Sequence, residues 1–322
     1  MTRPSVLLTR RWPSEVEAVI ARAYDVTFNP DDRPMSSASI ARALRDFDFI
    51  CPTVTDRIDA HMLSDANIRA KGLCNFGAGV SHIDLEACAV AGLVVTNTPD
   101  VLTDDTADLA ILLALMCARR AGEGERLVRR GRWRGWAPTH LLGTRLSGKT
   151  MGILGFGRIG QATAQRARRG LGMDILYSSR RRAPGAVECD LGARHVPLDQ
   201  LFREADVVSL HVPGGASNRH LVDGRRLSSM KASAILVNTA RGDILEEEAL
   251  IAALSDGTIA SAGLDVYENE PRIPPALRNL QNAVLLPHLG SATNETRVAM
   301  GLRVVTNLDA IIAGRAPPDR IA

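Results

Sequence analysis

The sequence lacks the cysteine spacing of a disulfide framework or a zinc site. It has five cysteines among 322 residues, an odd number, and they are widely spaced without any C-x-x-C pair. No apolar run approaches the roughly 18 residues of a membrane-spanning helix, and the first residues contain no cleavable hydrophobic region. We therefore expect a cytoplasmic protein with no metal site and no membrane partner.

The sequence also lacks a large excess of positive or negative charge. The 39 Lys and Arg residues and 36 Asp and Glu residues give a formal net charge of +3. A protein that binds nucleic acid through a strongly basic face would carry more positive charge. This balance argues against a nucleic-acid partner and leaves small anions as candidate ligands.

The length and the hydrophobic pattern predict two α/β domains. A chain of 322 residues is too long for one ordinary core, and 45% apolar with 23% charged residues is typical of a globular protein. Short apolar runs alternate with helical patterns, which favours βαβ units and parallel sheets. We expect strands at residues 6–9, 49–52, 72–76 and 94–97, then at 151–154, 174–177, 207–211, 234–238, 261–264 and 283–286. The later six would form a doubly wound sheet.

Two helical patterns connect these regions. One covers residues 103–120 after Pro99 and would cross from the early strands to the later ones. The other covers residues 293–313 and would return to the first domain, making that domain discontinuous. Two domains arranged in this way favour a cleft between them.

A glycine-rich motif follows the strand predicted at 151–154 and opens a helical segment at 161–169. Its residues are Gly155, Phe156, Gly157, Arg158, Ile159 and Gly160. The first glycine permits a tight turn, the second lets the backbone approach a pyrophosphate, and the third allows close helix packing. In this context the motif predicts a dinucleotide site, against the alternative of a glycine turn without a ligand.

The segment after the second strand of this sheet indicates which dinucleotide binds. NAD sites usually place Asp or Glu there to bind the ribose hydroxyls, but no carboxylate appears before Glu188. Hydroxyl and guanidinium groups suited to a 2′-phosphate occur instead, at Ser178, Ser179, Arg180 and Arg181. We therefore expect NADP(H) to be preferred over NAD(H). The alternative is a solvated surface run, most of all for Arg182.

Several motifs occur in one order along the whole chain. They are the glycine motif, N-T-A-R-G at 238–242, G-L-D-V at 263–266, Glu270-Pro271 and P-H-L-G-S at 287–291. With these motifs the sequence resembles the D-isomer-specific 2-hydroxyacid dehydrogenases. The runs W-R-G-W-A-P at 133–138 and L-G-S-A-T at 289–293 are most similar to the glyoxylate and hydroxypyruvate reductase branch.

The resemblance implies two Rossmann-like doubly wound parallel-sheet domains with the active site in the cleft between them. Residues 1–98 plus 291–322 would form the substrate-binding domain, and residues 99–290 the dinucleotide-binding domain. The implied reaction is reduction of a small 2-oxo acid such as glyoxylate or hydroxypyruvate to the 2-hydroxy acid.

Chemistry gives the motif residues their roles. Reducing an oxo acid needs a cation for the carboxylate, a proton donor for the developing alkoxide and a hydride at the carbonyl carbon. Arg241 would supply the cation and His288 the proton, because imidazole titrates near the working pH. Glu270 would bind the other ring nitrogen of His288, fixing its tautomer and favouring the protonated ring. Taken singly, His288 could be a structural histidine and Arg241 a surface ion pair.

The resemblance implies further contacts. The backbone amides of Ala78 and Gly79, in the loop at 76–80, would hold the substrate carboxylate, and Val54, Ser291 and Trp136 would also contact the substrate. The cofactor would be lined by Thr106, Val212, Pro213, Thr239, Ala240, Asp265, His288 and Gly290. Trp136 would reach the site of a neighbouring subunit, which implies a homodimer, whereas Trp133 is expected to be a core anchor. His82 and Asp84 are expected to be structural.

Two alternatives remain open from the sequence. The first is a 3-phosphoglycerate dehydrogenase or another D-2-hydroxyacid dehydrogenase, which would have the same fold. A 3-phosphoglycerate dehydrogenase would need more positive charge for its substrate phosphate. A nucleotide-sensing binding protein of the corepressor kind reuses the same scaffold. The width of the pocket depends on loop positions such as 53–55, so the order of preference among small oxo acids is also open.

Overall fold

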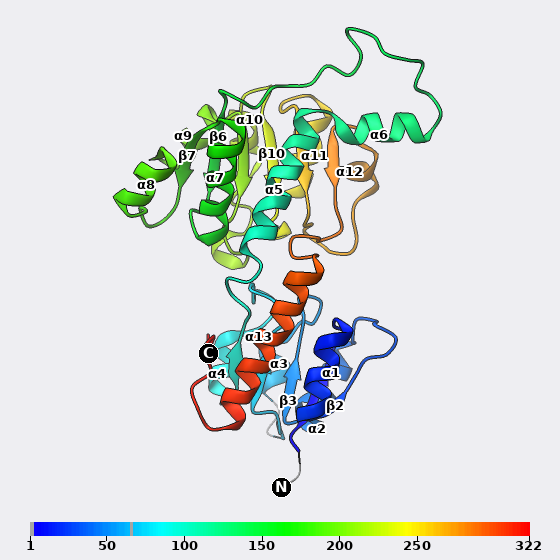
Figure 1. Ribbon diagram of the computed structural model, residues 1–322, viewed down its shortest axis with the longest axis vertical. Coiled ribbons are helices and arrows are strands. Elements are labelled where there is room, and N and C mark those ends of the chain that lie inside the picture. Colours follow the sequence, from blue (N-terminus) through cyan, green and yellow to red (C-terminus); the bar gives the residue numbers. More distant parts are fainter. Residues whose placement is uncertain (1–2, 65–66) are drawn as a thin grey trace. The chain divides into compact units, whose positions relative to one another are not determined.

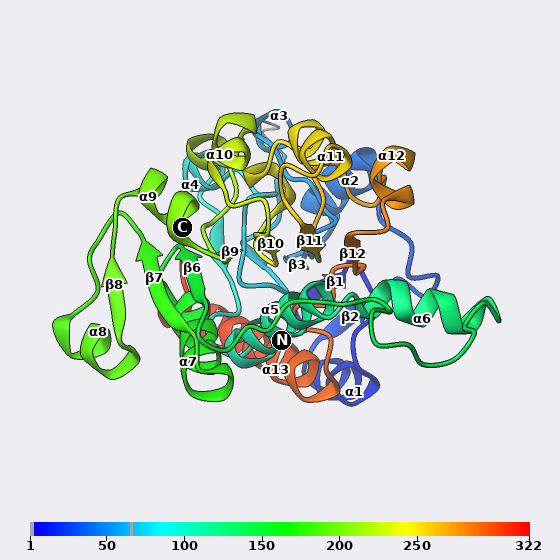
Figure 2. The same ribbon diagram turned by 90° about the horizontal axis from the view of Figure 1, so that it is seen from above.

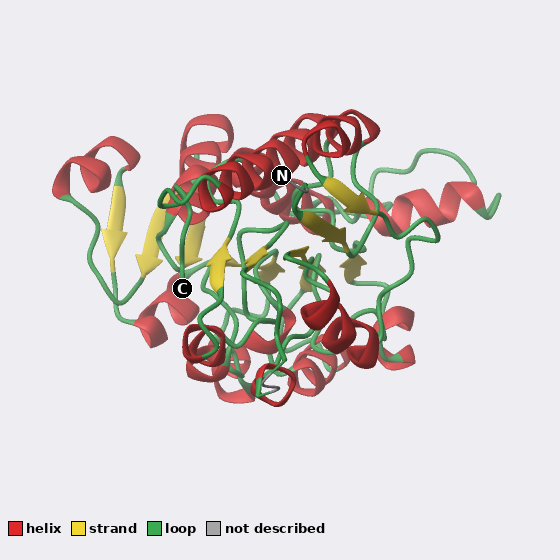
Figure 3. Cartoon of the chain, turned by 90° about the horizontal axis from the view of Figure 1, so that it is seen from below, coloured by secondary structure: helices red, strands yellow, loops and turns green. Residues whose placement is uncertain are grey.

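The computed structural model describes residues 3–64 and 67–322 (Figure 1). The chain forms two compact units, one made of the residues up to Leu102 together with Ser291–Ala322, the other of Thr103–Gly290. Each unit contains one parallel β-sheet with helices on both faces (Figure 3). The α/β class with two Rossmann-like parallel-sheet domains is therefore confirmed. None of the helices in the described ranges combines the length and apolarity needed to cross a lipid bilayer.

The first unit is built on a five-stranded sheet in the order β2-β1-β3-β4-β5. The strands are β1 (Ser5–Leu8), β2 (Asp25–Thr27), β3 (Phe49–Cys51), β4 (Gly72–Cys74) and β5 (Val94–Thr96). The helices are α1 (Ser14–Ala23), α2 (Ser37–Asp46), α3 (Ala60–Leu63), α4 (Leu85–Val90) and α13 (Asn294–Ile312).

Alternation along the strands divides the core of this unit between the two faces. Val6 and Leu8 of β1 join the cluster that includes residues of α1 and α13, whereas Leu7 joins the cluster that includes residues of α2 and α4. The C-terminal helix α13 approaches α1 closely at Gly301, where a Cβ atom would lie 2.6 Å from a methyl carbon of Val16. The C-terminal segment thus completes the core that the first hundred residues begin (Figure 1).

The second unit is built on a seven-stranded sheet in the order β12-β11-β10-β9-β6-β7-β8. The strands are β6 (Thr150–Leu154), β7 (Asp174–Ser178), β8 (Ala193–His195), β9 (Val207–Leu210), β10 (Ile235–Asn238), β11 (Ser261–Leu264) and β12 (Ala283–Leu285). The helices are α5 (Thr103–Ala118), α6 (Ala121–Arg129), α7 (Arg158–Leu171), α8 (Gly185–Leu191), α9 (Leu198–Glu204), α10 (Gly224–Ser229), α11 (Glu247–Ser255) and α12 (Pro275–Asn279). Two 3₁₀ turns, Ala216–Asn218 and Gly242–Ile244, complete it.

The helices of the second unit cover both faces of its sheet. Helices α5 and α7 lie on one side, and α9, α10 and α11 lie on the other (Figure 2). The strands are buried almost throughout, as in a parallel sheet covered on both faces. Helix α5 packs closely on β11, because Gly263 leaves room for Leu113, whose Cβ would lie 2.9 Å from an added Cβ. The carboxyl ends of these strands carry the loops described below.

The sequence prediction of six strands in this sheet was one strand short. The missed strand β8, like the missed β2 of the first unit, has three residues, lies at a sheet edge and is largely exposed. Helix α6 was also missed, and none of its residues is buried. Short exposed segments carry little of the apolar pattern on which such predictions depend.

Trp133 is not the core anchor that the sequence suggested. Its side chain is 55% exposed and that of Trp136 is 84% exposed, and all residues from 128 to 140 are exposed. Helix α6 and the loop after it project away from the sheet of their unit (Figure 1). An apolar residue in such a segment cannot reach the core of its own unit, so this expectation was wrong for the single chain.

Candidate active site

The glycine motif forms the turn between β6 and α7. Gly155 has φ +93°, and a Cβ there would lie 2.7 Å from the backbone of His211. A Cβ on Gly160 would lie 2.1 Å from the carbonyl oxygen of Gly155. A Cβ on Gly157, by contrast, would meet nothing within 4 Å, and no side chain caps this helix N-terminus. The turn therefore leaves open backbone amides beside free space, an arrangement that fits a pyrophosphate.

The three arginines that follow β7 differ in whether they have an ion-pair partner. Arg182 donates to both carboxylate oxygens of Glu188, at 2.9 Å each, and Glu188 also accepts from the hydroxyl of Tyr177. These contacts, that of Arg182 first, lower the pKa of Glu188 to about 2. Glu188 is therefore engaged as a carboxylate by its own neighbours. In the described part of the chain, the exposed Arg180 and Arg181 have no ion-pair partner.

The two serines between β7 and these arginines differ in exposure. Ser178 is buried, whereas Ser179 is partly exposed, and its hydroxyl donates to the carbonyl oxygen of Arg181 at 2.6 Å. That bond closes a small turn and leaves the hydroxyl oxygen able to accept. The turn thus presents hydroxyl and guanidinium groups and no carboxylate.

His288 and Glu270 form a hydrogen-bonded pair. His288 Nδ1 lies 2.8 Å from Glu270 Oε2, and Glu270 Oε1 accepts from the amide of Tyr267 at 3.0 Å. Burial acts to raise the pKa of Glu270, but the bond and charge of His288 outweigh it, and the net shift is downward. Because an ionised carboxylate can only accept, Nδ1 carries the hydrogen. This leaves Nε2 as the ring nitrogen that can exchange a proton with a ligand.

Arg241 is held in place by hydrogen bonds within its own loop. Buried Asn238 accepts from the amide of Ala240 at 3.0 Å and donates to the carbonyl oxygen of Arg241 at 2.9 Å. Gly242 permits close packing, because a Cβ there would lie 1.9 Å from the backbone of Tyr267. Within residues 3–64 and 67–322, no carboxylate lies within ion-pair distance of the Arg241 guanidinium.

The electrostatics of Arg241 favour an anionic ligand. Burial lowers the pKa of its guanidinium, and the charges of Glu270 and Asp243 act in the opposite direction. A partly buried cation without a bonded counter-ion is stabilised by an arriving anion. A carboxylate could meet its planar fork with two parallel hydrogen bonds.

Asp265 anchors the loop that carries His288. Its carboxylate accepts from the amides of Leu289 at 2.6 Å and Gly290 at 2.8 Å, and its carbonyl oxygen accepts from the amide of His288 at 2.9 Å. Thr106 donates to the carbonyl oxygen of Gly290 at 2.9 Å. Burial raises the pKa of Asp265, against the two amide bonds and the charge of His288. His288 itself has φ +56°, a conformation that this anchoring supports.

Three other predicted cofactor residues lie at the ends of neighbouring strands. Val212 and Pro213 follow β9, and Thr239 follows β10 and is buried. Strands β9 and β10 pair in parallel beside β6, so their carboxyl ends lie at the same edge of the sheet as the glycine turn. In open α/β sheets this edge is where ligands bind.

The loop at 76–80 in the first unit has its carbonyl groups occupied. Asn75 donates to the carbonyl oxygens of Gly77 at 2.8 Å and Gly79 at 3.2 Å, and Asn97 donates to that of Ala78 at 2.7 Å. Among the described residues, the amides of Ala78 and Gly79 have no hydrogen-bond acceptor. Two free amides in one turn suit a carboxylate.

Polar side chains beside this loop have structural roles. His82 Nε2 lies 3.0 Å from Asn75 Oδ1, and Asp84 caps α4 by accepting from the amide of Ala87 at 3.0 Å. Val54, in the loop after β3, is 40% exposed, and Ser291 is partly exposed.

The structure links several of the predicted residues of the second unit. Glu270, His288 and Asp265 are linked by hydrogen bonds, and Glu270 acts electrostatically on Arg241. Sequence reasoning missed Asn238 and Asn75, which hold the loops of Arg241 and Gly79. Each is an uncharged polar residue at the end of a buried strand, and Asn238 also opens the N-T-A-R-G motif, but neither feature indicated that the side chain holds a loop. In the part of the chain that the structure describes, no cluster of His, Cys, Asp or Glu could hold a metal ion.

Comparisons with known proteins agree with one another. A family model described as D-isomer specific 2-hydroxyacid dehydrogenase, NAD binding domain, matches residues 111–290. The glyoxylate reductase of Thermococcus litoralis is 43% identical over 323 residues, covering 99% of this chain and 97% of that protein. The solved structure of an NADPH-dependent glyoxylate/hydroxypyruvate reductase from Sinorhizobium meliloti, in complex with NADP and malonate, is 34% identical with a TM-score of 0.88, covering 100% of this chain and 97% of that one. A glyoxylate reductase structure from Paecilomyes thermophila is 34% identical with a TM-score of 0.87, covering 100% and 99%.

Proposed function

This chain belongs to the D-isomer specific 2-hydroxyacid dehydrogenases, in their glyoxylate reductase branch, and we propose that it reduces glyoxylate to glycolate and hydroxypyruvate to D-glycerate with NADPH. The observation that carries the proposal is the pair of His288 and Glu270 beside Arg241, a cation that has no ion-pair partner among the described residues. Reduction of a 2-oxo acid needs a proton donor and an anion receptor, and these residues have that chemistry.

His288 is the proposed general acid. The bond from Nδ1 to Glu270 leaves Nε2 to give its proton to the oxygen on C2 as that oxygen gains charge. The nicotinamide, when bound, supplies the hydride to C2. The products are the 2-hydroxy acid and the oxidised cofactor, and His288 then regains a proton from solvent. In the oxidative direction the same nitrogen accepts the proton.

Arg241 and the amides of Ala78 and Gly79 are the proposed receptors for the substrate. The guanidinium suits both the carboxylate and the oxo oxygen, because its donors lie in one plane. The free amides of Ala78 and Gly79 suit a carboxylate oxygen. Val54 and Ser291 are proposed to contact the remainder of the acid.

His288→Ala tests the central step. We expect kcat for glyoxylate to fall about a hundredfold or more, because the acid is removed. NADPH binding should be largely retained, because the glycine turn and the other proposed cofactor residues are unchanged. His61→Ala is the matched control, since His61 is exposed on α3 of the first unit. An unchanged kcat in His288→Ala would remove this residue from the role.

Preference for NADPH over NADH is proposed from Ser179, Arg180 and Arg181. Their turn offers donors to a 2′-phosphate, and Glu188 is occupied by Arg182 rather than left for ribose hydroxyls. Arg180→Met should raise KM for NADPH by about 10- to 100-fold, the effect of losing a hydrogen bond between charged groups. KM for NADH should change little.

The control for Arg180→Met is Arg194→Met. Arg194 is exposed on β8, and its guanidinium pairs with Glu204 of α9 at 2.9 Å. Its replacement should leave both KM values near those of the wild type. If wild-type protein used NADH as well as NADPH, the preference for the phosphorylated cofactor would be wrong while the reductase assignment stood.

A homodimer is proposed from the exposed segment around α6. Val128, Trp133, Trp136 and Leu142 are each more than half exposed there. Large apolar side chains gathered on a projecting segment mark an interaction surface. Sedimentation equilibrium should give a dimer mass for the wild type, and Trp133→Glu with Trp136→Glu should give monomers; a monomeric wild type would exclude the dimer.

A further inference from the structure

The carboxyl edge of the five-stranded sheet gathers three loops of the first unit. Thr9 and Arg10 follow β1, residues 52–55 follow β3, and the loop of Gly79 follows β4. Strands β1, β3 and β4 are neighbours in the sheet, with strand spacings of about 4.8 Å. The amide of Phe76 donates to the carbonyl oxygen of Pro52 at 2.8 Å, so the second and third loops are in direct contact.

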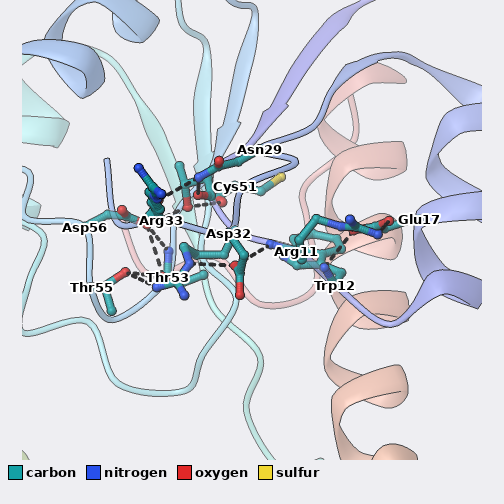
Figure 4. Close-up of polar contacts among 12 residues, drawn as sticks. Arg11, Trp12, Glu17, Asn29, Asp32, Arg33, Cys51, Thr53, Thr55 and Asp56 are labelled. Atoms are coloured by element: carbon teal, nitrogen blue, oxygen red, sulfur yellow. Dashed lines mark hydrogen bonds and ion pairs between the residues drawn. The ribbon is translucent and has the colours of Figure 1, made fainter. Parts of the chain in front are cut away.

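Buried Asp56 fixes the middle loop. Its Oδ2 accepts from the amide of Thr53 at 2.7 Å, from the hydroxyl of Thr53 at 3.2 Å and from the hydroxyl of Thr9 at 2.5 Å (Figure 4). Asp56 is fully buried, so these bonds are shielded from water. The loop that presents Val54 therefore has a defined position relative to the end of β1.

Arg10 lies against this loop. Its Nε donates to Asp32 Oδ1 at 2.8 Å, and its Nη1 lies 3.4 Å from the hydroxyl oxygen of Thr55. The hydroxyls of Thr53 and Thr55 are themselves 3.0 Å apart (Figure 4). The Arg10 side chain is 24% exposed, and in the described ranges its Nη2 has no acceptor. Donors of the Arg10 guanidinium thus lie next to the hydroxyl of Thr55, which lies next to that of Thr53.

The charge of Arg10 is largely balanced by Asp32. The hydrogen bond from Arg10 is the main cause that lowers the pKa of Asp32. The Asp32 carboxylate is ionised at neutral pH, as an ordinary Asp is. Asn29 holds the loop of Asp32 by donating to the carbonyl oxygens of Thr9 at 2.8 Å and Arg33 at 2.7 Å. A balanced guanidinium still donates hydrogen bonds but attracts a second anion weakly.

We propose that Arg10, with the hydroxyls of Thr53 and Thr55, forms a subsite for a hydroxyl group on C3 of the 2-oxo acid. The inference rests on the proposed function, in which the carboxylate of the same acid is held by Ala78 and Gly79. The loop after β3 lies between the loops of Arg10 and Gly79, next to the proposed carboxylate receptor, which places it within reach of a substituent on C3. Glyoxylate has no such substituent, whereas hydroxypyruvate has a hydroxyl and pyruvate only hydrogens.

Substrate selectivity tests the subsite. The measured quantity is the ratio of kcat/KM for hydroxypyruvate to kcat/KM for glyoxylate. Arg10→Met should lower this ratio by about tenfold, the effect of losing one hydrogen bond to a charged donor. Arg11→Met is the matched control and should leave the ratio unchanged, because the Arg11 guanidinium pairs with Glu17 at 2.9 Å on the exposed side of α1.

Asp32→Asn provides a second measurement, which should not change if Arg10 had only a structural role. It removes the charge that balances Arg10, so kcat/KM for oxaloacetate, which carries a carboxylate on C3, should rise relative to that for hydroxypyruvate. A ratio in Arg10→Met within about twofold of the wild type, or an equal loss for both substrates, would overturn the subsite.

The subsite can also be separated from the proposed function. If the wild type reduced neither acid, the proposed function would be wrong, and calorimetric titration with D-glycerate and glycolate would still decide the subsite. Tighter binding of D-glycerate that is lost in Arg10→Met would support it. Equal binding of the two acids in the wild type would overturn it.

Discussion

Replacing Asp265 with Asn tests how far activity depends on the loop that carries His288. The Asp265 side chain is 1% exposed, and its two oxygens accept from the amides of Leu289 and Gly290 at 2.6 Å and 2.8 Å. Asparagine has the same size but only one acceptor oxygen. One of the two amides would therefore face the side-chain NH₂ group, donor against donor, in a buried position.

The expected magnitude follows from these two bonds. A hydrogen bond to a charged group contributes about 1.5–3 kcal/mol, and a buried donor without a partner costs about 1–3 kcal/mol. Since the remaining bond also loses its charge, the native loop should be destabilised by about 2–4 kcal/mol. If that loss falls on the reactive conformation, kcat/KM for glyoxylate should decrease by about 30- to 1000-fold.

The assay is the initial rate of NADPH oxidation, with the Kd for NADPH measured separately by fluorescence. Asp190→Asn is the matched control, because Asp190 makes an exposed ion pair with Arg169 at 2.8 Å in the same unit. Such pairs contribute about 0–1 kcal/mol, so activity should stay near that of the wild type. A folded Asp265→Asn protein with kcat/KM within about threefold of the wild type would refute the reasoning.

Three further substitutions test other parts of the structure. Glu270→Gln should lower kcat by about tenfold to a hundredfold, because the charge that fixes the His288 tautomer is lost, and unchanged kcat would contradict this role. Gly160→Ala should abolish measurable NADPH binding, since the added Cβ would lie 2.1 Å from a carbonyl oxygen of the same turn, and binding at wild-type affinity would contradict the packing argument. Asp319→Asn should reduce the free energy of unfolding by about 2–3 kcal/mol at pH 7, because Asp319 is buried and bonded to Arg303. Burial acts to raise the pKa of Asp319, but its hydrogen bonds outweigh burial and the pKa is lowered overall. The stabilisation by Asp319 is therefore present above the ordinary Asp pKa of about 4 and is lost as the pH falls through the lower pKa of the folded protein. A stability difference between Asp319→Asn and the wild type that persists at low pH would contradict this.

Much of the fold could be predicted because its requirements are local. The central strands of both sheets are short buried apolar runs, and the turn of Gly155 and Gly160 needs glycines at fixed spacing for steric reasons. The edge strands β2 and β8 could not be predicted in this way, because half or more of each is exposed and the pattern disappears. The prediction for Trp133 was wrong for a related reason. The hydrophobicity of a side chain favours burial, but it does not indicate whether the burial occurs in the core of the same chain or against a partner.

The site could be predicted only in part for a different reason. His288 and Glu270 are 18 positions apart in sequence, and their side chains lie 2.8 Å apart in the structure. No local sequence pattern predicts this contact. Only the order of the motifs indicated that the two residues form a pair. Asn75 and Asn238 gave less signal still. Each is a single polar residue at the end of a buried strand, and its function depends on the carbonyl groups that the folded loop turns toward it.

The same construction recurs in both units. Asp56, Asn75, Asn238 and Asp265 each lie within a few residues of the carboxyl end of a parallel strand, are fully or almost fully buried, and bond to the backbone of the adjacent loop. Because a buried hydrogen bond is shielded from water, each of these bonds fixes its loop. Replacing Asp265 should therefore lower kcat/KM for both acids through loop position, whereas replacing a residue that contacts only the C3 substituent should alter substrate selectivity. The distinction can be measured by comparing Asp265→Asn with Arg10→Met on glyoxylate and hydroxypyruvate: only the second should change their ratio.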